Sequence, residues 1–239
     1  VARYGDWANK KFVKERVGDQ YANRFKIHFP NEERSAGRPL KTRPAYNYQR
    51  QLGAVFGLNY GWEHPLYFDE NCSESSGFTR QNWWHSVGRE VKMLRSNVGV
   101  IDISNFAKYT CKGPGAENWL ESVFANNMPK KIGQSCLTPL ISNYGGVAGD
   151  ATITRISEEE FWIVSSGASE RYQKRFFNSV KLPENTIFLS QTDEFCGFNI
   201  AGPKSREILQ RLSNQDLSNK NWPFMQSGIL SIAGVSCLA

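Results

Sequence analysis

The stretch that decides the fold is residues 108–120, KYTCKGPGAENWL. Its first residues predict a β-strand, and Gly113-Pro114 then opens a helix over 115–124, because proline is favoured in the first helical turn. Residues 198–209, FNIAGPKSREIL, repeat the order strand, Gly-Pro, helix. The repeat indicates either a duplicated α+β module or two helices that merely begin in the same way. We predict an α+β fold, with mostly antiparallel sheets and helices packed against them.

The flanking sequence supplies further elements of both kinds. Apolar residues on one side of each segment predict helices over 6–25 and 82–97. Further helices are predicted over 169–180 and, after Gly202-Pro203, over 204–212. Strands are predicted over 100–103, 107–111, 137–142, 147–156, 161–165, 186–190 and 195–200. Residues 228–239 are typical of a strand, a glycine turn and the start of a second strand, which suggests that the chain stops inside a sheet. Residues 56–68 are rich in aromatics without clear periodicity, and 69–81 look like a surface loop.

Composition excludes several classes of protein. The chain has 239 residues, of which 40% are hydrophobic and 13% aromatic, so wholesale disorder, a collagen-like chain and a disulfide miniprotein are ruled out. It contains no uninterrupted apolar run of roughly 18 residues, the length that a membrane-spanning helix needs. We therefore expect one large domain with a short appendage and no membrane partner.

The net charge of +6 is confined to the N-terminal fifth of the chain. Residues 1–50 hold 12 Lys+Arg and 5 Asp+Glu, so the rest of the chain is nearly neutral. A nucleic-acid surface would need aromatics interleaved with exposed cations. Here Trp7, Phe12 and Tyr21 instead fall at the spacing of a helix core, followed by an irregular connector over 26–48 that needs a surface to lie against. We predict a basic arm that docks on another part of a larger protein, with no nucleic-acid partner.

The cysteines and histidines do not form a metal-binding pattern. The five cysteines are scattered and none pairs as C-x-x-C, which predicts reduced, mostly buried thiols and a cytoplasmic or mitochondrial-matrix protein. The three histidines are equally dispersed, so we predict no metal site. His85, beside two tryptophans, could serve as a base, but it has no nucleophile or carboxylate partner in the sequence and is more typical of a packed or surface histidine.

The most suggestive local motif is residues 142–154, SNYGGVAGDATIT. Its glycines allow a tight turn and a close approach of the backbone to a ligand, and Asp150 follows at the start of a strand. A carboxylate there could deprotonate an amine or stabilise a developing cation. The alternative is a hairpin turn with a surface aspartate. The glycine spacing does not match a dinucleotide fingerprint or a phosphate loop.

A serine-rich run, SSGAS over 165–169, precedes the predicted helix 169–180. Its free amide groups could bind an anion, or a serine could cap the helix, and we favour the cap.

Several motifs in order resemble a known family. RSAGRP over 34–39, YGWEHP over 60–65 with Tyr67-Phe68, and GREV over 88–91 look like the junction in dimethylglycine and sarcosine dehydrogenases. In those enzymes a FAD-dependent oxidoreductase region is followed in the chain by a folate-binding domain. VIDISNFAK over 100–108, NYGGVAGD over 143–150 and IAGP over 200–203 are similar to the aminomethyltransferase domain shared with the glycine-cleavage T-protein.

The resemblance implies a domain that binds tetrahydrofolate and captures a one-carbon unit from an amine-derived iminium, giving 5,10-methylenetetrahydrofolate. Asp150 aligns with the family's catalytic carboxylate. The resemblance further implies folate-binding positions at Phe106, Tyr144, Val164, Ser165 and Ser166. Ser166 stands where T-proteins usually have asparagine.

The same resemblance implies how the chain is divided. Residues 1–55 correspond to the C-terminal end of the oxidoreductase middle region and a linker, and 56–239 to the N-terminal part of the folate-binding domain. The FAD-binding fingerprint and the downstream Tyr-x-Gly-Glu-x-Gly segment are absent, so we expect a fragment whose partners are the missing oxidoreductase domain and the second half of the folate domain. FAD is expected only in that missing N-terminal region. The alternative is a non-catalytic relative of the family.

Overall fold

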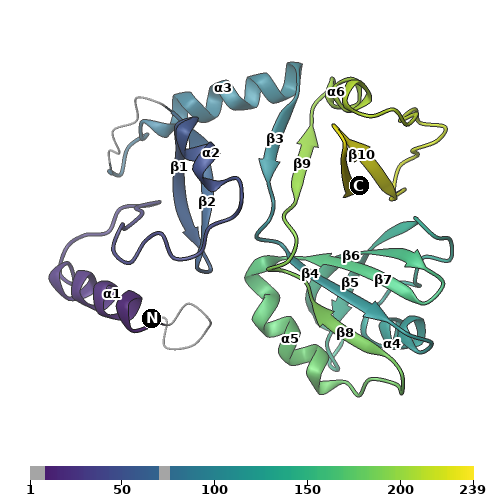
Figure 1. Ribbon diagram of the computed structural model, residues 1–239. Helices are drawn as coiled ribbons and strands as arrows, with labels where there is room; N and C mark the ends of the chain where they lie inside the picture. The colour runs from purple at the N-terminus through teal and green to yellow at the C-terminus, as the bar shows by residue number, and fades with distance from the viewer. Residues whose placement is uncertain (1–8, 70–75) are drawn as a thin grey trace.

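The computed structural model describes residues 9–69 and 76–239, and the following elements are found there (Figure 1). The helices are α1 (Lys10–Ala22), α2 (Tyr46–Gln51), α3 (Trp83–Ser96), α4 (Ala116–Val123), α5 (Glu170–Ser179) and α6 (Ser205–Leu212), with a 3-10 turn, η1 (Gly167–Ser169), before α5. The strands are β1 (Ala54–Asn59), β2 (Trp62–Phe68), β3 (Gly99–Asp102), β4 (Ala107–Lys112), β5 (Ser135–Ile141), β6 (Val147–Ser157), β7 (Glu160–Ser165), β8 (Ile187–Ser190), β9 (Phe198–Ala201), β10 (Ile229–Ile232) and β11 (Val235–Leu238).

The strands form one large sheet and three two-stranded ribbons. The large sheet has the order β5-β6-β7-β4-β8, and the ribbons are β1-β2, β3-β9 and β10-β11. Every strand pair within these sheets is antiparallel. In Figure 1 the β3-β9 ribbon rises from the large sheet towards α3 and α6. The predicted α+β fold is therefore confirmed.

The core lies on one face of the large sheet, against α4 and α5. Alternate residues of β4, namely Ala107, Tyr109 and Cys111, are fully buried there because successive side chains of a strand point to opposite faces. Aromatic rings from the two helices and β8 complete the packing, with Phe177 of α5 at 4.7 Å from the Phe188 ring. The opposite face of the sheet, here called the outer face, carries the remaining side chains of the same strands.

The two strand, Gly-Pro, helix units share one local geometry. Gly113 after β4 and Gly202 after β9 have positive φ, of 127° and 116°. A Cβ at Gly113 would lie 2.1 Å from a carbonyl oxygen, and one at Gly202 would lie 2.3 Å from another. Only glycine fits such positions, so both turns need the same residue for the same reason. The surroundings differ, since β4 lies inside the large sheet and β9 in a two-stranded ribbon.

The N-terminal arm is a helix with little buried apolar surface. Within the described residues the helix spans Lys10–Ala22, shorter than the predicted 6–25, and Trp7 lies outside them. Phe12 is buried against Gly37, whereas Tyr21 is 71% exposed. The prediction of a continuous core face is thus wrong for Tyr21, because the last turn of α1 contacts the connector through a polar side chain, Asp19, which pairs with Arg34 at 2.9 Å.

The connector does lie against a surface, the β1-β2 ribbon. Lys41 exchanges backbone hydrogen bonds with this ribbon, donating to Gly61 at 3.0 Å and accepting from Glu63 at 2.9 Å. The Arg38 guanidinium donates to the Glu63 carboxylate at 2.7 Å. This ribbon and α2 were not predicted, because Tyr60 and Gly61 turn the chain with positive φ inside an aromatic run that shows no alternation.

Three further sequence predictions can be compared with the structure. Residues 229–238 form the predicted hairpin. Among the described cysteines Cys111 is buried but Cys196 is exposed, so the expectation of mostly buried thiols is wrong; Cys72 lies outside the described residues. Within residues 9–69 and 76–239, no helix is long and apolar enough to cross a membrane.

Candidate functional site

Three of the predicted site residues meet at one end of the large sheet. The register pairs Ala107 of β4 with Ser165 of β7, and Ser165 with Ala151 of β6. The next residue towards the end of the sheet is Phe106 before Ala107, Ser166 after Ser165, and Asp150 before Ala151. Ala107, Ser165 and Ala151 are buried on the core side, so these three neighbours lie on the outer face. We call Phe106, Asp150 and Ser166 the end row.

The end row is accessible and chemically mixed. Phe106 is 40% exposed, and Asp150 and Ser166 are exposed as well. Gly167 allows the chain after Ser166 to come close to Phe106, since a Cβ at Gly167 would lie 1.8 Å from the Asn105 carbonyl oxygen. The result is an aromatic ring, a carboxylate and a hydroxyl at one edge of one face.

Val164 lies on the same face, one step further into the sheet. It pairs with Lys108 on one side and Thr152 on the other, and it is half-buried. Four of the six predicted residues therefore share the outer face at this end.

The other two predicted residues are placed differently. Ser165 is buried on the core side, where its hydroxyl donates to the Asp150 carbonyl oxygen at 2.5 Å. Tyr144 is 99% exposed on the turn between β5 and β6. The motif 142–154 thus forms the predicted hairpin, and within that hairpin Asp150 sits on the strand.

The serine run 165–169 does not cap a helix with a side chain. Ser169 has helical backbone angles and, like Ser166, makes no side-chain capping bond, so the prediction of a serine cap is wrong. The chain instead enters α5 through the 3-10 turn η1, in which the Ser169 N–H donates to the Ser166 carbonyl oxygen at 3.1 Å.

Lys108, which the sequence did not single out, anchors the segment that leads into the end row. Its side chain is buried, and its ammonium donates to the carbonyl oxygens of Ser104 and Phe106, each at 2.9 Å. Burial, with a contribution from the nearby Arg43 charge, lowers the pKa of Lys108 to about 8. This lysine fixes the backbone of Phe106 at the cost of holding a cation away from water.

Gln173 is a second residue that the sequence did not single out. It is 2% exposed, and its amide donates to the Ser165 hydroxyl at 2.6 Å. The sequence does contain a signal for the burial of Gln173, because this residue precedes Phe177 by one helical turn and therefore shares the buried face of α5.

A small cavity of 90 Å³ adjoins the end row. Asn105 and Gly167, the chain neighbours of Phe106 and Ser166, line it. Its wall also carries three cationic and two acidic side chains: Lys41, Arg171, Lys174, Glu170 and Asp193. The net charge beside the end row is therefore positive.

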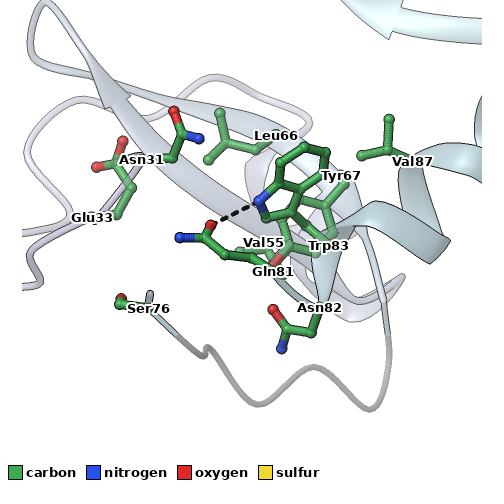
Figure 2. Close-up of a pocket in the computed structure, with 10 residues that line it drawn as sticks. All are labelled: Asn31, Glu33, Val55, Leu66, Tyr67, Ser76, Gln81, Asn82, Trp83 and Val87. Carbon is green, nitrogen blue, oxygen red and sulfur yellow. Dashed lines mark hydrogen bonds between the residues drawn. The ribbon is translucent and has the colours of Figure 1, made fainter. Parts of the chain in front are cut away.

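A larger cavity of 280 Å³ lies elsewhere, between the β1-β2 ribbon and the start of α3 (Figure 2). Figure 2 shows apolar side chains such as Leu66 and Trp83 on one side and polar ones such as Asn31 and Glu33 on the other. The Trp83 indole N–H donates to Gln81 at 2.8 Å. None of the predicted site residues lines this cavity.

The described residues give no support to metal chemistry or to His85 as a base. No group of three metal-ligating side chains occurs within them. His85 lies exposed on α3 and so outside the large sheet that carries the end row.

Two family models match successive stretches of the chain. Residues 45–239 match the model of the GCVT N-terminal domain, and residues 1–42 match that of the FAD dependent oxidoreductase central domain. Mitochondrial dimethylglycine dehydrogenase of Mus musculus is 30% identical over 99% of this chain. The chain spans 28% of the length of that relative.

Aminomethyltransferases are similar as well. The enzyme of Thermoanaerobacter sp. (strain X514) is 28% identical over 83% of this chain and 50% of its own length. The crystal structure of glycine cleavage system aminomethyltransferase T from Bartonella henselae has the same fold, with a TM-score of 0.65 at 24% identity over 79% of this chain and 47% of that one. The chain thus belongs to the GCVT N-terminal domain family, as an aminomethyltransferase-type domain related to dimethylglycine dehydrogenase.

Proposed function

We propose that this chain binds tetrahydrofolate and carries the catalytic carboxylate of a one-carbon transfer from a methylated amine. The observation that carries the proposal is the end row, which brings together Asp150 on β6, Phe106 just before β4 and Ser166 just after β7 at one accessible edge. This chemistry is also supported by the chain's membership of the GCVT N-terminal domain family and by its similarity to enzymes named dimethylglycine dehydrogenase and aminomethyltransferase.

The chemical nature of the outer face fits a folate. A pterin is flat and carries N–H donors, and this face offers apolar surface from Phe106 and Val164 beside a carboxylate and a hydroxyl. Folates are anionic, and the cavity beside the end row is lined by an excess of cations. Tyr144, exposed on the turn before β6, would close over the ligand from the side. The Ser165 hydroxyl faces the core, so we propose that it supports the site rather than contacting the ligand.

Asp150 would act on the protons and charges of the transfer. When bound, tetrahydrofolate supplies the two nitrogens that accept the methylene carbon. The net transfer joins that carbon to N5 and N10, breaks its bond to the amine nitrogen, and moves two N–H protons to the amine, which leaves as an ammonium ion. The Asp150 carboxylate is placed to accept one of these protons and pass it on, and its negative charge stabilises the iminium carbon that is attacked.

The rest of the reaction belongs to other parts of a longer chain. We propose that residues 1–55 are the end of an oxidoreductase region and its linker, and that 56–239 are the first part of the folate domain. A FAD-containing region would oxidise the methylated amine to the iminium, and a second folate half would complete the pocket. In a eukaryote we place the protein in the mitochondrial matrix, since the name of its mouse relative describes that enzyme as mitochondrial, and otherwise in the cytoplasm.

The test uses the longest natural chain that contains these residues. Tetrahydrofolate binding is measured by calorimetry, and methylene transfer by the fraction of amine turnover that yields 5,10-methylenetetrahydrofolate while free formaldehyde is removed by an aldehyde dehydrogenase. We expect Asp150→Asn to lower the transfer rate by about 10²- to 10⁴-fold, the usual contribution of a general acid–base group, with folate still bound.

Glu159→Gln is the matched control, because it neutralises an exposed carboxylate at the far end of the same strand pair. It should leave the transfer unchanged. Absence of folate binding by the natural chain, or full transfer activity in Asp150→Asn, would refute the proposed function.

A further inference from the structure

A buried chain of polar groups lies directly beneath the end row. It consists of Tyr109 on β4, Gln173 on α5 and Ser165 on β7, each at most 5% exposed. Tyr109 donates from its hydroxyl to the Gln173 carbonyl oxygen at 3.0 Å. The Gln173 amide nitrogen donates to the Ser165 oxygen at 2.6 Å, and the Ser165 hydroxyl donates to the Asp150 carbonyl oxygen at 2.5 Å.

The direction of these hydrogen bonds is determined at the Tyr109 end. Burial raises the pKa of Tyr109, so the phenol keeps its proton and donates. The Gln173 carbonyl must then accept, which turns its NH₂ group towards Ser165. With its oxygen accepting from Gln173, the Ser165 hydroxyl has its own proton free for Asp150. The three hydrogen bonds therefore run in one direction, each side chain donating to the next and Ser165 donating to Asp150.

The last bond of this chain acts on the backbone of the residue that carries the candidate catalytic carboxylate, because the Ser165 hydroxyl donates to the Asp150 carbonyl oxygen. On the β7 side the paired residues end at Ala151 and Ser165, so Asp150 lies just beyond the last pair of this ladder. The Ser165 side chain thus ties the backbone of Asp150 to β7 at the end of the sheet.

Gln173 also sets the position of the chain just before Asp150. A Cβ at Gly149 would lie 3.3 Å from the Gln173 amide nitrogen, so a glycine allows the strand to settle on the amide. The surrounding core is apolar, and its aromatic rings include Phe177 one turn along α5 and Phe188 on β8. A buried amide in such a core lowers stability unless it is fully hydrogen-bonded. In this polar chain the Gln173 carbonyl oxygen and amide nitrogen each make a hydrogen bond, and the chain of bonds ends at the backbone of Asp150, an exposed residue.

We propose that Gln173 and Ser165 are positioning residues that hold the backbone of Asp150, and with it the carboxylate, in the geometry that methylene transfer needs. This inference rests on the proposed function of Asp150. It goes further by assigning a role to two residues that would not touch folate or the amine.

The first experiment measures kcat, KM for tetrahydrofolate and thermal stability in the longest natural chain, comparing wild type with Gln173→Leu. We expect kcat for methylene transfer to fall by about 10- to 100-fold, since small displacements of a catalytic group are costly, while the dissociation constant for tetrahydrofolate changes less than about threefold. Thr186→Val is the control, because it removes a buried hydrogen bond, to the Gly115 N–H, at the opposite end of β4. It should lower stability and leave kcat unchanged.

A second variant gives a readout that a purely structural role would not produce. In Gln173→Glu the protonated carboxyl can accept from Tyr109 and donate to Ser165, so the chain of bonds is kept. Once ionised, the new carboxylate accepts from both neighbours and draws the Ser165 proton away from Asp150. We therefore expect kcat of this variant to be near that of wild type at low pH and to fall as the pH rises, in a range where wild type does not change.

The outcomes separate this inference from the proposed function. A wild-type chain with no methylene transfer would refute the proposed function. Transfer in wild type with unchanged kcat in Gln173→Leu, or a loss of kcat that Thr186→Val reproduces at equal stability, would overturn the inference alone. Should Gln173→Leu fail to fold, the pH profile of Gln173→Glu decides, and a profile identical to that of wild type would overturn it.

Discussion

Lys108→Met tests the electrostatic cost of burying a lysine beside the end row. Lys108 is 5% exposed, and its pKa falls from 10.5 to about 8 because burial disfavours its charge. Between these two values the folded protein loses the proton while the unfolded chain keeps it, so stability rises with pH in that window. The charged side chains that also act on Lys108 are Arg43, Glu170 and Asp102.

The magnitude follows from the two pKa values. At pH 7 the buried charge costs about 3 kcal/mol of unfolding free energy, and about 2 kcal/mol of this is recovered by pH 9.5. Lys108→Met removes this pH-dependent contribution. It also removes the donor to the Ser104 and Phe106 carbonyl oxygens, which is a loss that does not vary with pH. The stability of wild type should therefore rise by about 2 kcal/mol relative to the variant between pH 7 and 9.5.

The assay is urea unfolding followed by tryptophan fluorescence at several pH values across this range. Lys112→Met serves as control, because Lys112 lies on the same strand and is exposed in an ion pair with Glu160 at 3.2 Å. Its difference from wild type should not vary by more than about 0.5 kcal/mol, the usual size of a surface effect. If the difference between wild type and Lys108→Met is equally constant, the reasoning about the buried charge is wrong.

Three other substitutions probe the parts of the fold that carry the site. Glu117 accepts hydrogen bonds from Lys130 and the buried Arg155, and these bonds lower the pKa of its carboxyl group. The stabilisation of the folded state by the ionised carboxylate is therefore present above the pKa of the unfolded chain and is lost as the pH falls through the pKa of the folded protein. Glu117→Gln should cost about 1–3 kcal/mol at pH 6 and much less in acid, as seen by urea unfolding at each pH. Gly113→Ala should lower the free energy of unfolding by more than about 3 kcal/mol, because the new Cβ would strike a carbonyl oxygen. Gly145→Ala, at a glycine that also has positive φ but lies in open space, should lower it by about 1 kcal/mol. Equal losses of stability in thermal melts of the two variants would contradict this reasoning. Phe177→Ala should cost about 3–5 kcal/mol by the same measurement, and a loss under 1 kcal/mol would show that the aromatic cluster is not packed as described.

Local signals in the sequence predicted most elements of the body of the protein. Helix α3, predicted over 82–97, spans Trp83–Ser96, and the strand–Gly-Pro–helix units appear at both expected places. These elements rest on interactions within a few residues, such as apolar spacing and the turn at a glycine. The β1-β2 ribbon was missed because its strands show no alternation. Phe12 of α1 is buried while Val17 and Tyr21 are exposed, because contacts with distant residues decide burial.

The candidate site divides in the same way. The resemblance named Phe106, Val164, Ser165, Ser166 and Asp150, but nothing local distinguishes the two adjacent serines. The register of β7 between β4 and β6 turns Ser166 to the outer face and Ser165 to the core. A shift of one residue would exchange them, because side chains alternate along a strand.

The sequence by itself determined the fold class, the two glycine turns before α4 and α6, and the hairpin that presents Asp150, because each depends on residues close together in the chain. Only the tertiary structure decided that Phe106, Ser166 and Asp150 share one edge, and that Gln173 reaches Asp150 through Ser165. Those contacts join segments on different strands and a helix. Their geometry follows from sheet register and the packing of α5, which no short stretch of sequence specifies.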